Sequence, residues 1–412
     1  MSGKYKETGI AWCPRIPEEW EVRLLSQTAQ EHYIKKPKDE MFPVLSLSYG
    51  NIIVKNNINA GLVPQNYDNY QVVEKGNIIL RLTDLQNDHT SLRTGLAKDF
   101  GIITSAYLCI ETKENPDYLH YLLHAYDVKK VFYGMGSGVR QSLSWSDMRR
   151  LSIPVPPLAE QNKIVAYLDS KVSKINTLVN IKKKQIESLE ELKKAKISHD
   201  VTRGLNKNAP LKESGIAWLG KIPQGWEVVP LKRTVSVRNQ KSEFKATNGD
   251  KYIGLENIQS YSNELLETAT EYEDSVQSVC CKGDIMFGKL RPYLSKVIIS
   301  PCDAFCTSEL LIMYDFKGIS EYLRYLLLNQ QFISTVNTST YGAKMPRANG
   351  NFILNLSIPV PPLPEQKEIV LHLDSWCAKV SKAIANLTAE IQNLESLKTR
   401  LISDVVTGVR RV

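Results

Sequence analysis

Apolar residues recur at intervals of three and four positions along two long stretches of the chain, the first of which, residues 158–203, contains neither proline nor glycine. This spacing is typical of coiled-coil helices, so it predicts two helices of roughly 40 residues, each about 60 Å long. Three lysines, Lys182, Lys193 and Lys398, interrupt the apolar seams. The seams consist of Val165, Leu168, Val172, Ile175, Val179, Ile186 and Leu189, and of Val370, Leu373, Cys377, Val380, Ile384, Leu387, Ile391, Leu394 and Leu401.

Two helices with matching seams in one chain most simply pack against each other. An antiparallel pair lets the chain pass from domain to helix to domain to helix, although packing of each helix on its own domain stays an alternative. Each stretch ends beside a glycine suited to a C-terminal cap, Gly204 in the first and Gly408 in the second. We therefore predict a nearly circular fold in which the second helix returns the C-terminus to the neighbourhood of Lys6.

The chain carries an internal duplication that includes both helices. Residues 6–22 read KETGIAWCPRIPEEWEV and residues 212–228 read KESGIAWLGKIPQGWEV. The run LSIPVPPLAEQNKIVAYLDS from Leu151 matches LSIPVPPLPEQKEIVLHLDS from Leu356. Both ends of each copy are therefore retained, and the repeat predicts one scaffold used twice.

Weaker matches keep the frame through the diverged middle of the copies. They pair a short amphipathic helix at 118–123 with 322–327, a turn before a strand at 75–78 with 282–285, and residues 43–47 with 252–255. Drift after an old duplication is one explanation of the divergence. We favour another, in which a common partner contacts the retained ends, because their proline- and tryptophan-rich sequences look exposed.

A composition of 42% hydrophobic and 23% charged residues over 412 positions supports two or three globular units, each with its own core. The formal net charge of +8 is compatible with a nucleic-acid partner without requiring one. No apolar run reaches the roughly 18 residues of a membrane span, and residues 1–9 lack a signal-peptide core, so we expect a cytoplasmic protein. Seven cysteines, an odd number, favour a reducing compartment without disulfides.

Motifs for catalysis, cofactors and metals are incomplete. Residues 283–290 (GDIMFGKL) approach a phosphate-binding loop, but Leu290 stands where that loop needs a hydroxyl for magnesium. Residues 132–138 (FYGMGSG) follow a predicted helix instead of a strand, unlike the glycine loop of a methyltransferase. The cysteines within residues 280–306 have no counterpart in the first copy and fit no common zinc finger. We therefore expect no catalytic residue, cofactor or metal site.

The diverged segments are rich in side chains that can contact DNA. In the first copy, residues 81–95 and 136–145 carry mainly Arg, Gln, Asn, Thr and Ser, whereas residues 289–296 and 342–349 of the second copy are more basic and include an aromatic. Different side chains on one frame predict two different half-sites. The candidate DNA-binding residues are Arg81, Thr83, Asp84, Gln86, Asn87, Ser91, Arg93, Arg140, Gln141, Ser142, Lys289, Arg291, Tyr293, Lys296, Lys344 and Arg347.

The motifs GIAWCPRIPEEW and GIAWLGKIPQGW, the two IPVPPL-x-EQ runs before the long helices and the VTRGL run resemble those of the specificity subunit of type I restriction-modification enzymes. The resemblance covers essentially the whole chain. It implies an α+β fold with two similar globular target recognition domains separated by two long antiparallel coiled-coil helices, in a pseudo-two-fold, near-circular arrangement. Cys13-Pro14 departs from the pattern, since the second copy has the more typical Leu219-Gly220.

The resemblance also suggests domain boundaries. Residues 1–157 are expected to form the first target recognition domain, with its terminal motif at 6–22, and residues 158–204 the first long conserved helix. Residues 205–362 then hold the linker and the second target recognition domain, and residues 363–412 the second long conserved helix.

In function, the resemblance implies a non-catalytic subunit that binds double-stranded DNA and reads a bipartite target, one half-site per domain. In that family two methyltransferase subunits dock on the conserved helices and two restriction/translocase subunits join them. Alternatives are the specificity subunit of a related system that only methylates or cuts on both sides of its target and, from another class, a coiled-coil scaffold that binds only proteins. The candidate docking residues are Trp12, Trp20, Pro156, Pro157, Glu160, Gln161, Trp218, Trp226, Pro361, Pro362, Glu365 and Gln366.

Overall fold

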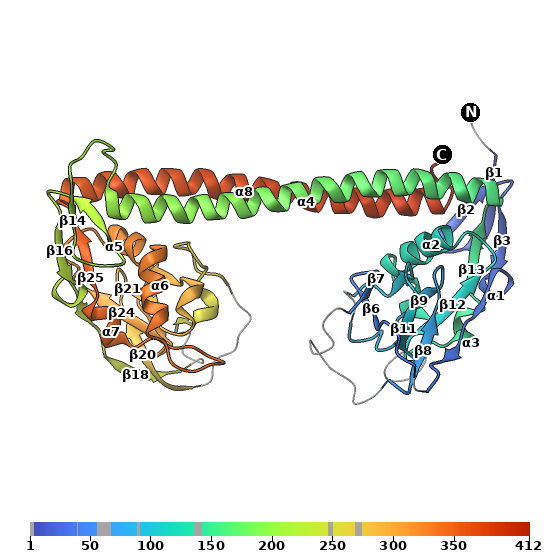
Figure 1. Ribbon diagram of the computed structural model, residues 1–412, viewed down its shortest axis with the longest axis horizontal. Helices are drawn as coiled ribbons and strands as arrows, with labels where there is room; N and C mark the ends of the chain where they lie inside the picture. Colours follow the sequence, from blue (N-terminus) through green and yellow to red (C-terminus); the bar gives the residue numbers. More distant parts are fainter. Residues whose placement is uncertain are drawn as a thin grey trace. The chain divides into compact units, whose positions relative to one another are not determined.

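The chain folds into two compact units, here called unit 1 (Met1–Lys182 with Ala389–Val412) and unit 2 (Lys183–Thr388). Each holds one globular α+β domain and the adjoining part of both long helices, α4 (Leu158–Arg203) and α8 (Leu363–Val406) (Figure 1). The predicted fold class and the chain order of domain, helix, domain, helix are confirmed. The computed structural model describes residues 4–38, 40–55, 67–88, 91–135, 142–245, 250–267 and 274–412.

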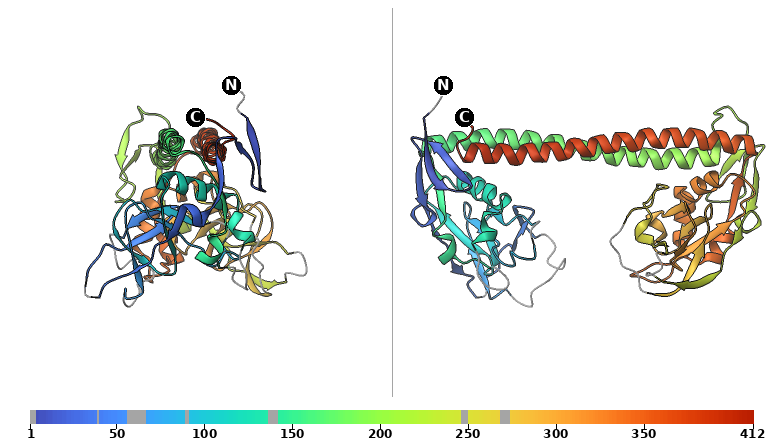
Figure 2. Two further views of the ribbon diagram at one scale, coloured as in Figure 1. Left: turned by 90° about the vertical axis from the view of Figure 1, so that its right-hand side faces the viewer. Right: turned by 180° about the vertical axis from the view of Figure 1, so that it is seen from behind.

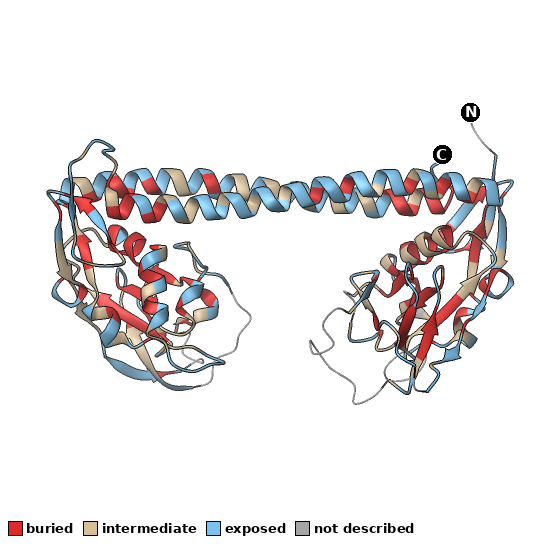
Figure 3. Ribbon diagram, viewed as in Figure 1, coloured by how far each residue is buried: buried red, intermediate tan, exposed pale blue. Residues whose placement is uncertain are grey.

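Within each unit α4 and α8 pack antiparallel. Their apolar seam positions are buried or half-buried, and the residues between the seam positions are mostly exposed (Figure 3). The three lysines that interrupt the seams each contact a polar side chain of the opposite helix. These pairs are Lys182 with Glu390 and Lys398 with Asn176 in unit 1, and Lys193 with Ser381 in unit 2. Polar partners thus let charged residues occupy the seam while marking its register.

The domain of unit 1 is built on a four-stranded antiparallel sheet of order β10-β9-β12-β4 and a three-stranded sheet of order β11-β8-β5. Helix α2 carries the predicted amphipathic segment and begins at an asparagine cap, Asn115, whose side chain accepts from two backbone N–H groups. The elements are β1 (Tyr5–Ile10), β2 (Cys13–Pro17), β3 (Glu21–Leu24), α1 (Leu25–Thr28), β4 (Ala29–Glu31), β5 (Ile34–Lys35), β6 (Leu45–Ser48), β7 (Asn51–Val54), β8 (Tyr70–Val73), β9 (Ile78–Leu80), β10 (Thr94–Leu96), β11 (Gly101–Thr104), β12 (Leu108–Thr112), α2 (Pro116–Val128), α3 (Trp145–Met148) and β13 (Ser152–Val155).

The domain of unit 2 repeats this plan with sheets of order β17-β24-β21-β22 and β18-β20-β23-β19. Its core, like that of unit 1, is continuous with apolar residues of both long helices. The elements are β14 (Leu211–Glu213), β15 (Lys221–Pro223), β16 (Glu227–Pro230), β17 (Ser236–Val237), β18 (Lys241–Phe244), β19 (Tyr252–Ile253), β20 (Ser275–Cys280), β21 (Ile285–Gly288), β22 (Val297–Ile299), β23 (Ala304–Cys306), β24 (Leu310–Tyr314), α5 (Ser320–Leu327), α6 (Gln330–Thr338), α7 (Gly350–Asn355) and β25 (Ser357–Val360).

The weaker sequence matches correspond to equivalent places in the two domains. The turns before β9 and β21 are closed in the same way. In each, a side-chain oxygen, of Asn77 in one copy and of Asp284 in the other, accepts a hydrogen bond at 2.8 Å from the backbone N–H three residues earlier. A parallel bridge from Val44 to β11 corresponds to the parallel pairing of β19 with β23. The duplication therefore extends through the diverged middle, as predicted.

The tryptophans in the near-identical ends are buried where each domain packs on the long helices, so the expectation that these ends are exposed is wrong for them. Trp20 and Trp226 are each 1% exposed. Their indole N–H groups donate to Glu160 at 2.9 Å and to Glu365 at 2.8 Å, in the first turns of α4 and α8. Packing inside each unit therefore accounts for much of the near-identity without a common external partner.

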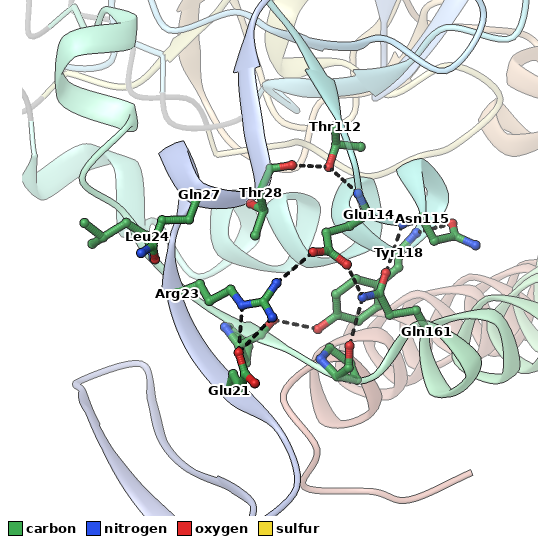
Figure 4. Close-up of polar contacts among 12 residues, drawn as sticks. Glu21, Arg23, Leu24, Gln27, Thr28, Thr112, Glu114, Asn115, Tyr118 and Gln161 are labelled. Atoms are coloured by element: carbon green, nitrogen blue, oxygen red, sulfur yellow. Dashed lines mark hydrogen bonds and ion pairs between the residues drawn. The ribbon is translucent and has the colours of Figure 1, made fainter.

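A buried glutamine fixes the start of each long helix to its domain. Gln161 accepts a hydrogen bond from the backbone N–H of Asn115 at 3.0 Å and donates to the carbonyl of Pro156 at 2.9 Å (Figure 4). Gln366 makes the corresponding bonds in unit 2. The Glu-Gln pair after each proline run is thus used internally, which the sequence motif alone did not reveal.

Each unit also contains a buried tyrosine whose hydroxyl contacts the C-terminal end of a long helix, α8 in unit 1 and α4 in unit 2. Tyr118 Oη lies 2.9 Å from the carbonyl oxygen of Pro154 and 3.3 Å from that of Val406, the last residue of α8. Tyr322 repeats the arrangement with the carbonyl of Val201 near the end of α4, at 3.1 Å. Each domain is therefore bonded to the beginning of one helix and to the end of the other.

The segment after α8 lies beside β1 in unit 1, so the predicted return of the C-terminus to the neighbourhood of Lys6 is confirmed (Figure 2). Tyr5 Oη donates to the carbonyl of Gly408 at 3.1 Å, and Gly408 adopts the left-handed conformation (φ 74°) expected of a helix cap. The terminal motifs of the two copies differ where the sequences do. Ile10 pairs with Cys13 across β1 and β2, whereas Gly220 closes a turn by donating to the carbonyl of Ile216.

Candidate nucleic-acid interface

The loop between β9 and β10 in unit 1 is folded around a buried arginine. Arg93 is 0% exposed, and its guanidinium donates to the backbone carbonyls of Thr83 at 2.7 Å, Asp84 at 3.3 Å and Asp88. The guanidinium therefore bonds the loop from inside. The expectation that Arg93 contacts DNA is wrong, because its donors are already used within the domain.

Two amides form the outward surface of this loop. Gln86 and Asn87 are exposed, and Asn87 donates to the carboxylate of Asp84 at 2.7 Å, which orients the Asn87 amide. Asp84 itself has a left-handed backbone (φ 56°). Arg81, Thr83, Asp84 and Ser91 are partly buried around the base of the loop. Amides of this kind can read base edges in a groove.

A second predicted segment lies beside this loop. The backbone N–H of Leu143 donates to the carbonyl of Leu82 at 2.9 Å, which places the exposed Ser142 next to the residues after β9. The two segments that diverge in sequence are therefore brought together in space. Arg140 and Gln141, the other candidates of this segment, lie outside the described residues.

Unit 2 joins its two variable segments in the same way. The backbone N–H of Ala348 donates to the carbonyl of Lys289 at 2.9 Å, and that of Arg291 donates to Pro346 at 2.7 Å. Arg291 has a left-handed backbone (φ 48°), as Asp84 does in unit 1, and both residues stand at the same place after the equivalent strand. The predicted DNA-binding segments thus form one loop frame that carries an acidic residue in one copy and a basic one in the other.

Several basic side chains lie on this frame in unit 2, and they differ in whether they are exposed or already paired inside the domain. Lys344 is exposed, whereas Arg347 pairs with Glu309 at 2.9 Å. Burial, reinforced by the Arg347 cation, lowers the pKa of Lys289. The ammonium of Lys296 donates to the carbonyl of Leu255 inside the domain at 2.5 Å. Lys344 and Arg291 are therefore the candidate cations best placed to meet a phosphate or a base.

Exposed apolar side chains accompany these cations. Tyr293, which the sequence singled out, is 51% exposed, and Tyr341 and Met345, which it did not, are 62% and 58% exposed. Tyr293 and Met345 belong to the two joined segments of unit 2, and Tyr341 directly precedes the second segment and forms a bridge with Arg347. Large apolar side chains in a turn beside basic residues are the signal that could have identified Tyr341 and Met345, since such residues can contact thymine methyl groups or stacked bases.

The docking candidates divide into internal and surface residues. The side chains of Trp20, Gln161, Trp226 and Gln366 are fully used inside the units, so the expectation that they contact a partner subunit is wrong. Among the other docking candidates, Trp12, Glu160, Trp218 and Glu365 are half-buried. Pro156 and Pro361 are buried, whereas Pro157 and Pro362 are exposed at the surface.

Over the described ranges, no group of three or more His, Cys, Asp or Glu side chains is placed to hold a metal ion. No helix in the same ranges is both long enough and apolar enough to cross a membrane.

The fold and its paired loops define a class of protein with two variable-loop domains, each joined to the same two long helices. Residues 17–188 and 223–393 both match the family model for the type I restriction modification DNA specificity domain. The two matches cover most of the chain, which therefore belongs to this family.

Similar proteins agree with this assignment. The chain is 28% identical to the specificity subunit of the type I restriction enzyme MjaVIII from Methanocaldococcus jannaschii, over 97% of this chain and 94% of that protein. It is 24% identical to the EcoDI specificity subunit of Escherichia coli, over 68% of this chain and 67% of that one.

Solved structures share the fold. A chain from a structural study of type I restriction-modification complex assembly has a TM-score of 0.69 at 16% identity, with 95% of this chain and 98% of that chain covered. The HsdS subunit of Thermoanaerobacter tengcongensis covers the same shares at 16% identity, with a TM-score of 0.50.

Proposed function

We propose that this chain is the non-catalytic, DNA-reading subunit of a cytoplasmic type I restriction-modification complex and that each domain reads one half of a split double-stranded target. The observation that carries the proposal is the shared loop frame with different side chains. At the same place after the equivalent strand, unit 1 presents Asp84 followed by the exposed amides Gln86 and Asn87, whereas unit 2 presents Arg291. One scaffold with two chemical surfaces suits two different half-sites.

The proposal includes assembly with two methyltransferase subunits and two restriction/translocase subunits. The similar proteins are named as a specificity subunit of a type I restriction enzyme and as part of a type I restriction-modification complex, which supports assembly but not these numbers. The long helices offer a surface for this. Large apolar side chains are exposed along both helices, in contrast to the buried residues of the retained motifs. These side chains are Leu178, Ile181, Leu192, Leu371 and Leu397. Exposed apolar residues on a helix face are suited to packing against helices of another chain.

Exchange of one domain tests the reading of half-sites. Residues 23–150 are replaced by the same region of a relative with a different target, and the methylated motif is determined by methylome sequencing of a host that carries the complex. We expect one half of the motif to change while the other half and the spacer stay the same. A change in both halves would contradict modular reading.

A gel shift with the methyltransferase partner separates this function from that of a protein-binding scaffold. A DNA-reading subunit should bind its target in a salt-dependent manner and lose about tenfold or more affinity when one half-site is scrambled. A scaffold should show no preference between the two DNAs. Whether the assembled complex restricts or only methylates is decided by adding the restriction subunit and assaying cleavage.

A further inference from the structure

The C-terminal tail of unit 1 places an arginine between two carboxylates. Arg411 lies 2.5 Å from a carboxylate oxygen of Glu19 and 3.3 Å from one of Glu160. Glu160 also accepts the indole N–H of Trp20, so the guanidinium sits beside the tryptophan that joins the domain to α4. The tail enters this place just after Gly408, whose backbone lies against the Trp20 ring.

Unit 2 contains the corresponding place, and it is an open pocket of about 450 Å³. Glu365 and Trp226 repeat the bond of Glu160 with Trp20, and Gly204 lies against the Trp226 ring as Gly408 lies against Trp20. Glu368, one helical turn after Glu365, supplies a second carboxylate to the pocket wall. The remaining walls are largely apolar and include several prolines, namely Pro210, Pro223, Pro362 and Pro364.

The chain segment that follows Gly204 does not fill this pocket with a cation. The linker turns at Asn206, whose carbonyl accepts from the backbone of Ala209 and whose side chain accepts from that of Asn208. Lys207 lies in that turn and is exposed. Among the residues that the structure describes, no ion pair is formed by Glu365 or Glu368. The two units thus share the tryptophan–glutamate pair, beside which the chain's own arginine lies in unit 1 and a pocket is open in unit 2. The second carboxylate differs, since Glu19 of unit 1 is replaced by Gly225 and unit 2 has Glu368 on the long helix instead.

We propose that the pocket formed by Trp226, Glu365 and Glu368 binds an arginine side chain from an extended segment of another protein. The arrangement of Arg411 in unit 1 supplies the precedent for the ligand, since a planar guanidinium can pair with two carboxylates at once while a lysine ammonium acts as a point charge. Apolar proline and tryptophan walls suit the methylene stem of such a side chain and an extended backbone beside it. Within the described part of the chain, no residue of the variable loops lines the pocket, so this proposal does not depend on the DNA-reading function.

The test uses the full chain and a capped peptide of its own tail sequence, residues 408–412 (GVRRV), as the arginine probe. Tryptophan indoles are labelled with ¹⁵N, and the signals of Trp226 and Trp20 are assigned by conservative Trp→Phe variants. We expect titration of the peptide to shift the Trp226 signal and leave the Trp20 signal unchanged. A peptide with both arginines replaced by lysine should bind about tenfold more weakly or worse.

Variants then assign the response to the two carboxylates. Glu365→Gln together with Glu368→Gln should reduce affinity about tenfold or more, and the amide oxygen at position 365 can still accept the Trp226 indole N–H, which keeps the fold. Glu19→Gln in unit 1 is the matched control and should leave the Trp226 response unchanged. Arg411→Ala should open the second site, so that the peptide now shifts Trp20 as well.

An unmoved Trp226 signal at millimolar peptide would overturn the proposal. So would equal binding of the lysine peptide, or a response that survives the double glutamine variant. The Trp20 response of Arg411→Ala tests the internal precedent separately, and its absence would remove the basis for assigning arginine as the ligand.

Discussion

Arg93 and Lys296 show how a cation in a predicted DNA-binding loop can be structural. Arg93 directly precedes β10, and Lys296 directly precedes β22, the equivalent strand of unit 2. The backbone carbonyl of Arg93 accepts a hydrogen bond from the N–H of Arg81, and that of Lys296 accepts one from the N–H of Gly288. Each also turns its side chain inward to backbone carbonyls. The two cations fix the loops on which other residues are presented, so positive charge in these segments has two separate roles.

Arg291 and Lys344 are the cations whose removal should affect DNA binding directly. We expect Arg291→Ala and Lys344→Ala to weaken binding, because both side chains lie on the joined loops of unit 2. Loss of a phosphate contact should weaken all sequences alike and lower the slope of log affinity against log salt by about 1. Loss of a base contact should cost roughly 1 to 3 kcal/mol and relax one position of the motif.

Binding titrations at several salt concentrations distinguish these outcomes, and methylome sequencing identifies any relaxed position. Lys232→Ala is a suitable control because Lys232 is exposed in unit 2 and lies outside both variable loops. If neither affinity nor the motif changed in either loop variant, the assignment of both residues would be withdrawn.

Asp127 gives unit 1 a predictable dependence on pH. Its side chain is 1% exposed, one oxygen accepts the backbone N–H of Arg93 at 2.6 Å, and burial raises the pKa of the carboxyl to about 6. The neutral carboxyl is therefore favoured in the folded state. Its contribution to stability is complete below the unfolded pKa of 3.8 and is lost as pH rises through 6.

The total change from this group is about 3 kcal/mol, at 1.36 kcal/mol per pKa unit. Asp127→Asn keeps an acceptor for the Arg93 N–H and removes the titration. We therefore expect the free energy of unfolding of the wild type, relative to the variant, to fall as pH rises from 4 to 7 in urea titrations. A constant difference over that range would show that Asp127 is not buried in this way.

At the residue scale the sequence could identify the variable segments but not the orientation of their side chains. Arg93 and Gln86 belong to the same polar run, and only the folded loop separates the buried guanidinium from the exposed amide. Tyr341 and Met345 were missed for the converse reason, since apolar residues are usually assigned to a core. Burial is decided by contacts between distant segments, which local composition does not contain.

At the scale of elements, the junction between domain and helices explains the retained ends of the duplication. Prolines, a tryptophan and a Glu-Gln pair look like surface features in a linear sequence. In the fold, Trp20 and Gln161 each bond an element that is distant in the chain. The periodicity of three and four predicted the helices themselves because an apolar seam repeats locally, whereas the partners of the junction residues lie far away in sequence.

Tyr118 provides a test of this junction. Its hydroxyl lies between two buried carbonyls, so Tyr118→Phe should lower the free energy of unfolding of unit 1 by about 1 to 3 kcal/mol. Tyr121→Phe is the matched control, because the Tyr121 hydroxyl bonds Asp169 near the surface at 2.7 Å and should contribute less. Hydrogen exchange of α2 and of the end of α8 reports the effect. Equal protection in the two variants would argue against a structural role of the Tyr118 hydroxyl.

At the scale of the whole molecule, the two units differ in whether they are continuous in sequence. Unit 2 is formed by a continuous segment, whereas unit 1 combines the beginning of the chain with residues 389–412. Val405 and Val406 of that last segment belong to the core of unit 1. Unit 1 can therefore complete its core only after the C-terminus has been synthesised, and this long-range closure is expected to fold later than unit 2.

The two helices run from one unit into the other, so in the proposed function their length should set the unread spacer between the half-sites. Seven residues inserted after Lys182 in α4 and seven before Glu390 in α8 lengthen both helices where these two residues pair. One heptad preserves the seam, adds about 10 Å and corresponds to roughly three base pairs at about 3.4 Å each. We expect the methylated motif of this variant to keep both half-sites and to gain about three base pairs of spacer. Insertion into α4 alone should displace its pairing with α8 and reduce the yield of folded protein. An active double-insertion complex with the original spacer would refute the idea that the helices measure this distance.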